Sequence, residues 1–152
     1  MAIQKAVAVV PYSQQQMFDL VVNMDDYPLF LPWCVKARKF DVAATQFMAE
    51  MTVSFKGVRE VFQTVDRVWP PERIQISLHK GPFEHLENEW RFVAVEAGTR
   101  IDFIIDFRFK KRLLDLTLGP FFGAATQKMV EAFQKRAEAI YNAPYSASPH
   151  GS

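Results

Sequence analysis

The sequence has little of several features that mark common classes of protein. Its one cysteine, Cys34, cannot form a disulfide within the chain, which is typical of proteins kept in a reducing compartment. No apolar run approaches the roughly 20 residues that a membrane-spanning helix needs. The 18 basic and 17 acidic residues leave a net charge of +1, so no overall charge attracts the chain to nucleic acid or to a membrane. We therefore expect no DNA partner and no membrane span.

The start of the chain also lacks the pattern of a secretory signal peptide. Gln4 and Lys5 interrupt the first apolar residues, and a strand pattern begins at once. These absences favour a cytoplasmic protein, with peripheral contact at the inner face of a membrane left open. The length of 152 residues is typical of one domain. We expect a ligand-binding domain over residues 1–142 and a flexible tail, rich in Pro, Ser and Gly, over residues 143–152.

Patterns that support catalysis are scarce as well. The histidines lack metal-ligand spacing, no serine lies in a nucleophile-elbow glycine pattern, and no glycine-rich phosphate loop is present. Asp102 and Asp106 share a strand face with Arg100 and Arg108, which is typical of an ion-paired outer surface. The sequence therefore predicts a binding protein, with no catalytic residue, no metal and no cofactor.

What the chain does have is phenylalanine, with 14 residues in a sequence that is 49% hydrophobic. Phenylalanine has no polar atom, so this number indicates either a large core or an apolar cavity. Apolar and polar residues alternate in the predicted strands, most cleanly from Ile101 to Phe109. The expected strands cover residues 3–10, 35–40, 47–55, 58–69, 74–78, 86–92 and 101–109.

Two short helical segments should follow the first strand. Ser13 and Gln16 have the spacing of a capping box, which predicts a helix that begins after Ser13 and ends near Asn23. Asp25 and Asp26 can cap a second short turn. The apolar segment that follows, over residues 27–33, is expected to be a loop bracketed by prolines.

From Arg112 onward the apolar spacing changes to three and four residues, which predicts an amphipathic helix up to about Ile140. At Gly119 and Pro120 we expect this helix to kink, or to restart with Pro120 in its first turn. The turns between strands are too short for crossover helices, so neighbouring strands should pair antiparallel. The predicted fold class is α+β: a curved antiparallel sheet of about seven strands, wrapped on a long C-terminal helix, with two short helices after the first strand.

Three segments carry a family resemblance. They are Val10-Pro11-Tyr12-Ser13 with Met17-Phe18-Asp19-Leu20-Val21 and Tyr27-Pro28-Leu29-Phe30-Leu31-Pro32-Trp33-Cys34; Gly81-Pro82-Phe83 with Trp90-Arg91-Phe92; and Met129-Val130-Glu131-Ala132-Phe133 with Arg136-Ala137 and Tyr141. On these segments the sequence resembles the START-like superfamily, whose helix-grip fold has the same element order. Within it, the chain is similar to the coenzyme-Q-binding, polyketide cyclase/dehydrase-like proteins and their bacterial relatives, the ribosome-association toxins. Pro120 departs from the family's uninterrupted helix.

The resemblance implies binding of ubiquinone or a similar isoprenoid lipid between the sheet and the long helix. The chain would then act as a carrier or chaperone that supports respiratory electron transport. An alternative is a ribosome-associated regulator that binds the large subunit and blocks subunit joining, for which the basic groups at residues 36–39 and 110–112 are candidates. A cyclase-type enzyme of the same fold would need several polar groups facing the cavity. The inward series over residues 101–109 is almost entirely apolar, which argues against such an enzyme.

The candidate site combines the segment over residues 27–33 with the inward faces of the strands. That segment is a lid over a cavity mouth, a loop that contacts a membrane, or a plug at one end of the core, and the sequence leaves these alternatives open. Periodicity alone favours close packing between sheet and long helix, whereas the resemblance implies a cavity there. The candidate ligand-binding residues are Leu29, Phe30, Trp33, Phe62, Leu78, Phe83, Asn88, Trp90, Phe103, Phe107, Leu118, Phe121, Phe122 and Met129.

A quinone head group carries carbonyl oxygens, so an apolar site for it also needs hydrogen-bond donors. Asn88 shares a strand face with Trp90. Thr64 shares one with Phe62 and Val68. Lys80 follows Leu78 on the same side, near the end of a strand. All three polar residues are candidate partners of the head group, although a solvated position is about twice as frequent for residues of this kind.

Overall fold

Seven antiparallel strands form one curved sheet in the computed structural model, which describes residues 2–55 and 57–142. The order across the sheet is β1-β7-β6-β5-β4-β3-β2, so every pair except β1 and β7 joins strands that are consecutive in the chain. This confirms the predicted α+β class with its curved antiparallel sheet. The strands are β1 (Ala2–Val10), β2 (Cys34–Phe40), β3 (Gln46–Phe55), β4 (Val58–Trp69), β5 (Arg73–Lys80), β6 (Phe83–Val95) and β7 (Gly98–Phe109).

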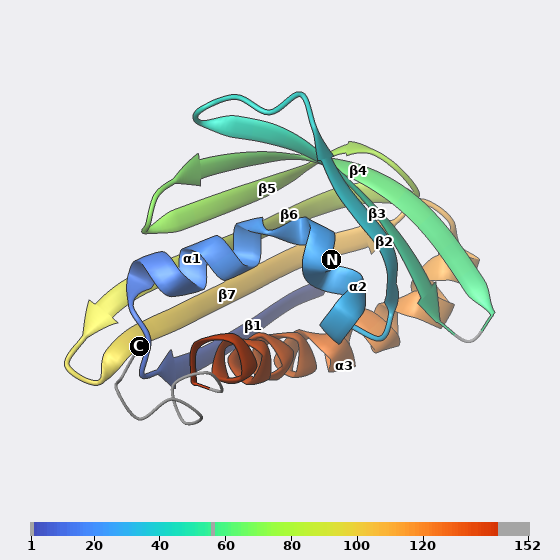
Figure 1. The fold of residues 1–152 in the computed structure, drawn as a ribbon. Coiled ribbons are helices and arrows are strands. Elements are labelled where there is room, and N and C mark those ends of the chain that lie inside the picture. The colour runs from blue at the N-terminus through green and yellow to red at the C-terminus, as the bar shows by residue number, and fades with distance from the viewer. Residues whose placement is uncertain (1, 56, 143–152) are drawn as a thin grey trace.

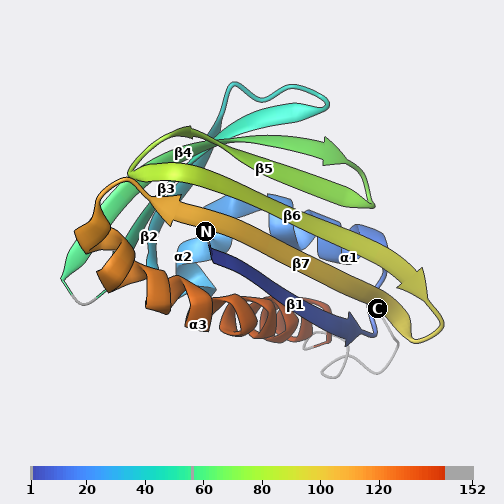
Figure 2. The same cartoon turned by 180° about the vertical axis from the view of Figure 1, so that it is seen from behind.

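The helices lie on the concave side of this sheet, with α3 running along it beside β1 (Figure 1). Figure 2 shows the opposite, convex side, where the strands face the viewer, α1 and α2 lie behind them, and α3 runs along the edge of the sheet beside β1. Among the described residues, none of the helices combines the length and the apolar character needed to cross a bilayer. The helical segments are α1 (Gln14–Val22), η1 (Met24–Asp26), α2 (Tyr27–Phe30), α3 (Arg112–Ala137) and η2 (Glu138–Asn142).

The capping box predicted for the first helix is present. The Gln16 backbone N–H donates to Oγ of Ser13 at 3.1 Å, and the Ser13 backbone N–H donates to Oε1 of Gln16 at 2.9 Å. The helix ends with Asn23 as its C-cap, as expected. The side-chain amide of Gln14 also donates to the Phe92 carbonyl at 2.7 Å, which fastens the start of α1 to β6.

One expectation about the helices was wrong, and one of two alternatives at Pro120 is excluded. Residues 27–30 form the short helix α2 instead of a loop, because Pro28 lies in the first turn, where its missing N–H breaks no helical hydrogen bond. The long helix does not restart at Pro120, because α3 continues as one helix from Arg112 to Ala137. Both Pro120 and Leu116, whose carbonyl loses its hydrogen-bond donor, are exposed, so water can satisfy the freed carbonyl.

The apolar interior consists of two clusters. The larger one packs α1, α2 and the C-terminal half of α3 against the sheet, around Trp90, Phe92 and Phe133. The smaller one, here called the far-end cluster, has the fully buried core Phe83, Leu86, Phe107, Phe109 and Leu118. Phenylalanine therefore serves both as ordinary core and, as described below, as part of a cavity wall.

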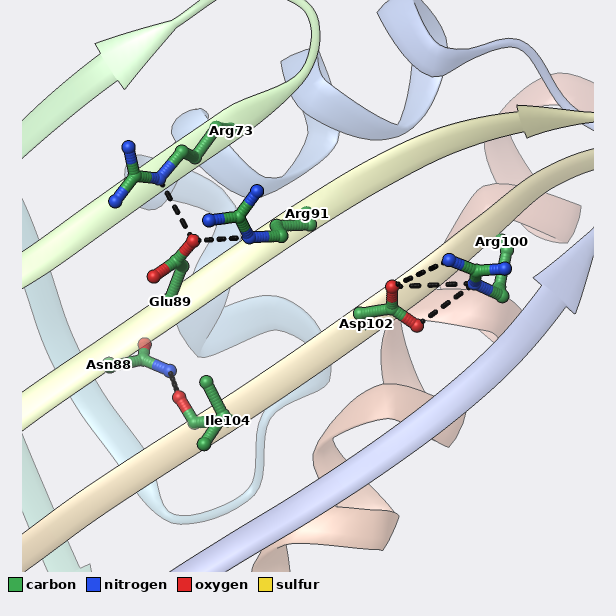
Figure 3. Close-up of polar contacts among 7 residues, drawn as sticks. All are labelled: Arg73, Asn88, Glu89, Arg91, Arg100, Asp102 and Ile104. Atoms are coloured by element: carbon green, nitrogen blue, oxygen red, sulfur yellow. Dashed lines mark hydrogen bonds and ion pairs between the residues drawn. The ribbon is translucent and has the colours of Figure 1, made fainter.

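The outer face of β5, β6 and β7 carries ion pairs. Nε of Arg100 lies 3.1 Å from Oδ1 of Asp102, and Nε of Arg73 lies 2.9 Å from Oε2 of Glu89 (Figure 3). His85 contacts Asp106 in the same way at 3.1 Å. This agrees with the expectation that the acidic residues of β7 belong to a charged outer surface.

Candidate ligand-binding cavity

A cavity of about 110 Å³ lies between the concave face of the sheet and α3. Strands β3 to β7 contribute its roof, the α3 residues Ala125, Thr126, Met129 and Phe133 contribute the opposite wall, and the segment from η1 to Trp33 closes one side. The strands place alternate residues on this face because side chains of a β-strand alternate between its two sides. The predicted gap between sheet and helix is therefore present.

Aromatic rings form the most rigid part of the wall. The indole of Trp90 is 2% exposed, and its ring centroid lies 4.7 Å from that of Phe103 and 5.1 Å from that of Phe133, both in edge-to-face contact. Edge-to-face pairs of this kind fix ring orientation. A flat apolar group in the cavity would meet preformed aromatic faces and edges at this end.

The segment over residues 27–33 divides between the cavity and the surface. Tyr27, Leu31 and Trp33 line the cavity, with Tyr27 and Leu31 buried. Leu29 points away and is 70% exposed. The segment therefore supplies one side of the wall and also presents an apolar side chain outside it.

Six of the candidate ligand-binding residues lie in the cavity wall. Their roles as ligand contacts stay predictions. The six are Trp33, Phe62, Asn88, Trp90, Phe103 and Met129.

Six other candidates lie outside the wall. Leu29 is on the surface, and Phe30 packs on Tyr27 and Phe133 with the guanidinium of Arg136 over its ring. The remaining four belong to the far-end cluster or pack against it. Leu78 and Phe107 have the inward strand parity that the sequence predicts, whereas Phe83 precedes an irregularity in the β6 register and Leu118 comes from α3. These four are Leu78, Phe83, Phe107 and Leu118. The side chains of the last two candidates, Phe121 and Phe122, lie outside the described residues.

Asp66 is a cavity residue that sequence reasoning missed. It lies in the wall, is 4% exposed, and accepts a hydrogen bond at Oδ1 from Oγ1 of Thr64 at 2.6 Å. Burial raises the pKa of its carboxyl from the ordinary 3.8 to about 6, against the lowering effects of the Thr64 hydrogen bond and the Lys39 charge. The signal was present, because Asp66 continues the inward series that contains Thr64 and Val68.

Other polar groups near Asp66 have partners of their own. The hydroxyl of Tyr27 donates to the Val21 carbonyl, and burial, together with the charges of Asp66 and Cys34, raises the Tyr27 pKa well above 10.0. Burial also raises the pKa of the Cys34 thiol to about 11, so this cysteine is a poor nucleophile. The ammonium of Lys39 lies 5.0 Å from the centroid of the Phe47 ring.

The Asn88 amide, the predicted polar partner on β6, is engaged within the sheet. Its Nδ2 donates to the Ile104 carbonyl at 2.7 Å (Figure 3). In the sheet register Asn88 and Asp66 are both opposite Ile76, one on each side of β5. Two polar residues therefore flank one apolar residue across the roof of the cavity.

Comparison with known proteins identifies the family of this chain. The ribosome association toxin RatA of Rickettsia prowazekii is 34% identical over 139 residues, which cover 87% of this chain and 93% of the relative. The mitochondrial coenzyme Q-binding protein COQ10 homolog B of Xenopus laevis is 32% identical over 138 residues, covering 88% of this chain and 57% of the relative. These relatives are named as a toxin and a binding protein, not as enzymes.

A solved structure is similar to this chain in both fold and sequence. The solution structure of an 18 kDa protein of Caulobacter crescentus has a TM-score of 0.77 and 36% identity, covering 94% of this chain and all of that one. A family model described as polyketide cyclase / dehydrase and lipid transport matches residues 10–134. Since this match covers most of the chain and the fold agrees, the chain belongs to the polyketide cyclase / dehydrase and lipid transport family.

Proposed function

We propose that the chain binds ubiquinone or a similar isoprenoid lipid in the cavity and serves as a carrier or chaperone that supports respiratory electron transport. The observation that carries this proposal is the cavity itself, whose wall is mostly apolar and aromatic. Burial of apolar surface provides about 25 cal/mol per Å², so such a wall favours a hydrophobic guest. The similarity to a coenzyme Q-binding protein of Xenopus laevis supports the choice of ligand.

The size of the cavity indicates which part of the ligand it takes. A cavity of roughly 150 Å³ in another protein holds one benzene molecule, and the cavity here is about 110 Å³. The cavity therefore offers room for part of a single substituted ring. An isoprenoid tail would leave through the opening, or side chains such as Met129 and Trp33 would move aside for it.

Filling the cavity tests this proposal. Ala125 is buried and faces the cavity from α3, whereas its neighbour Ala124 is exposed. In Ala125→Phe the new ring would occupy most of the free volume, so binding of decylubiquinone should weaken at least tenfold. Ala124→Phe adds the same ring outside and should bind like the wild type. Quenching of the fluorescence of Trp33 and Trp90, both in the wall, measures the binding.

Unfolding curves of both variants show whether Ala125→Phe is still folded. Equal binding by two folded variants would place the ligand elsewhere and overturn the proposal. A second measurement is mass spectrometry of an organic extract of the protein purified from its native host, in which we expect a quinone or isoprenoid lipid. An extract without any such lipid, together with no binding of the added quinone, would contradict the function.

A ribosome-associated regulator is the second candidate, supported by the RatA relatives. Lys110, Lys111 and Arg112 are all exposed at the start of α3, and no ion pair to them is found in the described part of the chain. Cations are unfavourable at a helix N-terminus, so a phosphate-bearing partner would stabilise them there.

Cosedimentation with large ribosomal subunits at low salt tests this second candidate. Binding should weaken steeply with salt and should be lost in a variant that combines Lys110→Glu and Lys111→Glu. Lys128→Glu, which changes an exposed lysine farther along α3, is the control. Absence of cosedimentation at low salt would exclude the regulator.

The same end of α3 supports a peripheral contact with a membrane from the cytoplasmic side. Leu113 is 73% exposed and Leu116 is 63% exposed, next to the three basic residues. Exposed leucines beside cations are typical of segments that rest on anionic lipid. Cosedimentation with phosphatidylserine vesicles, lost in Leu113→Ser but kept in Lys128→Glu, would show the contact.

A further inference from the structure

Asp66 combines deep burial with incomplete hydrogen bonding. Its Oδ1 accepts from Thr64, but among residues 2–55 and 57–142 no hydrogen-bond partner is found for its Oδ2. The residue is 4% exposed, and it lies in the cavity wall. Oδ2 is not among the buried atoms without a partner, so it keeps accessible surface where Asp66 lines the cavity. A ligand group in the cavity that pairs with this oxygen therefore favours the occupied state.

The surroundings of Asp66 leave the cavity as the place for that group. Its register partners on the neighbouring strands are Phe47 on β3 and Ile76 on β5, both apolar. The groups that act on it electrostatically or by hydrogen bonding are Thr64 on its own strand, Lys39 on β2 and Tyr27 on α2. The Tyr27 hydroxyl already donates to a backbone carbonyl.

We propose that the Thr64–Asp66 pair is the polar recognition point of the cavity, where Asp66 forms a hydrogen bond with a ring oxygen of a neutral hydrophobic ligand. As a carboxylic acid, Asp66 donates to a carbonyl oxygen, and as a carboxylate it accepts from a hydroxyl. A quinone offers the carbonyl oxygen and a hydroquinone offers the hydroxyl group that these two forms require, whereas a hydrocarbon offers neither. This inference rests on the proposed function and adds the residue and the selectivity.

Protonation of Asp66 then selects between the oxidised and the reduced ring. Because burial raises the pKa of this carboxyl to about 6, it is mostly an acid at pH 5 and mostly a carboxylate at pH 8. Tyr27 and Cys34 have raised pKa values, so neither ionises in this range. Phenolic hydroxyls of a hydroquinone also stay protonated, since phenols ionise near pH 10.

Binding of three probes at pH 5 and pH 8 tests the inference: decylubiquinone, decylubiquinol under anaerobic conditions, and decylbenzene. In the wild type, affinity for the quinone should fall about tenfold from pH 5 to pH 8, the quinol should not weaken, and decylbenzene should not respond. Asp66→Asn keeps an N–H donor and cannot ionise, so its quinone affinity should not depend on pH. Asp102→Asn, on the outer face, should behave like the wild type.

Thr64→Val separates recognition from a merely structural role. It has nearly the same shape as threonine but removes the hydrogen bond that lowers the Asp66 pKa, so the midpoint of the quinone response should move to higher pH. A pH-independent wild type, or a response that persists in Asp66→Asn, would overturn the inference. Binding of decylbenzene as tight as that of the quinone would overturn it while leaving a hydrophobic cavity in place. Failure of all three probes would remove the proposed function as well.

Discussion

At the scale of single residues, Asp66 makes stability depend on pH. Its pKa is raised by burial from 3.8 to about 6, so the folded state holds a proton that the unfolded chain releases between these values. The folded state binds more protons in this window, and stability therefore falls as pH rises through it. The full cost, of about 3 kcal/mol, is reached above pH 6.

Asp66→Asn should remove this cost. The asparagine oxygen can still accept the Thr64 hydrogen bond, while no charge is buried. We expect the variant to be more stable than the wild type by about 1–3 kcal/mol at pH 8 and nearly equal to it at pH 4. Urea unfolding at the two pH values measures the difference. A variant that is less stable at pH 8 would mean that the carboxylate is well solvated or paired in the native state.

The residues of the site show what periodicity can and cannot predict. Parity along a strand placed Phe62, Trp90 and Phe103 on the inward side. The same parity applies to Asp66, which was missed because a carboxyl group is rarely found in a protein interior. Strand parity indicates the face on which a side chain lies, but not its position along the strand. Phe107 has the correct face but lies in the far-end cluster, and only three-dimensional packing separates this position from the cavity.

At the scale of elements, the strands and α1 could be predicted because local rules decide them. The alternation of apolar and polar residues and the turn residues between them predict the strands. The capping box of Ser13 and Gln16 predicts the start of α1. Residues 27–30 were expected to be a loop, although Pro28 is compatible with a first helical turn. At Pro120, tertiary packing keeps an unfavourable residue within the helix. In α3 the buried side chains Leu118, Ala125 and Phe133 lie on both sides of Pro120 and hold it in helical conformation.

Replacing Pro120 should therefore stabilise the protein. Proline inside a helix is about 3 kcal/mol less favourable than alanine, and exposure of Pro120 means that the change disturbs no core packing. We expect Pro120→Ala to raise the free energy of unfolding by about 2 kcal/mol. Gly119→Ala, with no atom closer than 4.0 Å to its new Cβ, should add about 1 kcal/mol. Urea unfolding measures both, and a loss of stability in Pro120→Ala would show that the proline conformation is needed by the fold.

At the scale of the whole molecule, sheet and helix enclose a space too small for a complete isoprenoid lipid. The cavity of about 110 Å³ lies between two packed clusters, with the far-end cluster closing the sheet beyond it. The curvature of the sheet thus creates the cavity, and its two packed ends limit the length of ligand that can be enclosed. A tail must therefore either stay outside or separate α3 from the sheet.

These two outcomes predict that ligand affinity depends on tail length in different ways. A fully enclosed tail would gain about 0.8 kcal/mol for each buried CH₂, which is about a fourfold gain in affinity per carbon. We expect the gain to stop after the first few carbons, because the closed cavity has no room for more. Titration with a series of ubiquinone analogues of increasing alkyl length, with each affinity corrected for partition into micelles, measures this. A fourfold gain that continues to ten carbons would show that the sheet and α3 separate to admit the whole tail.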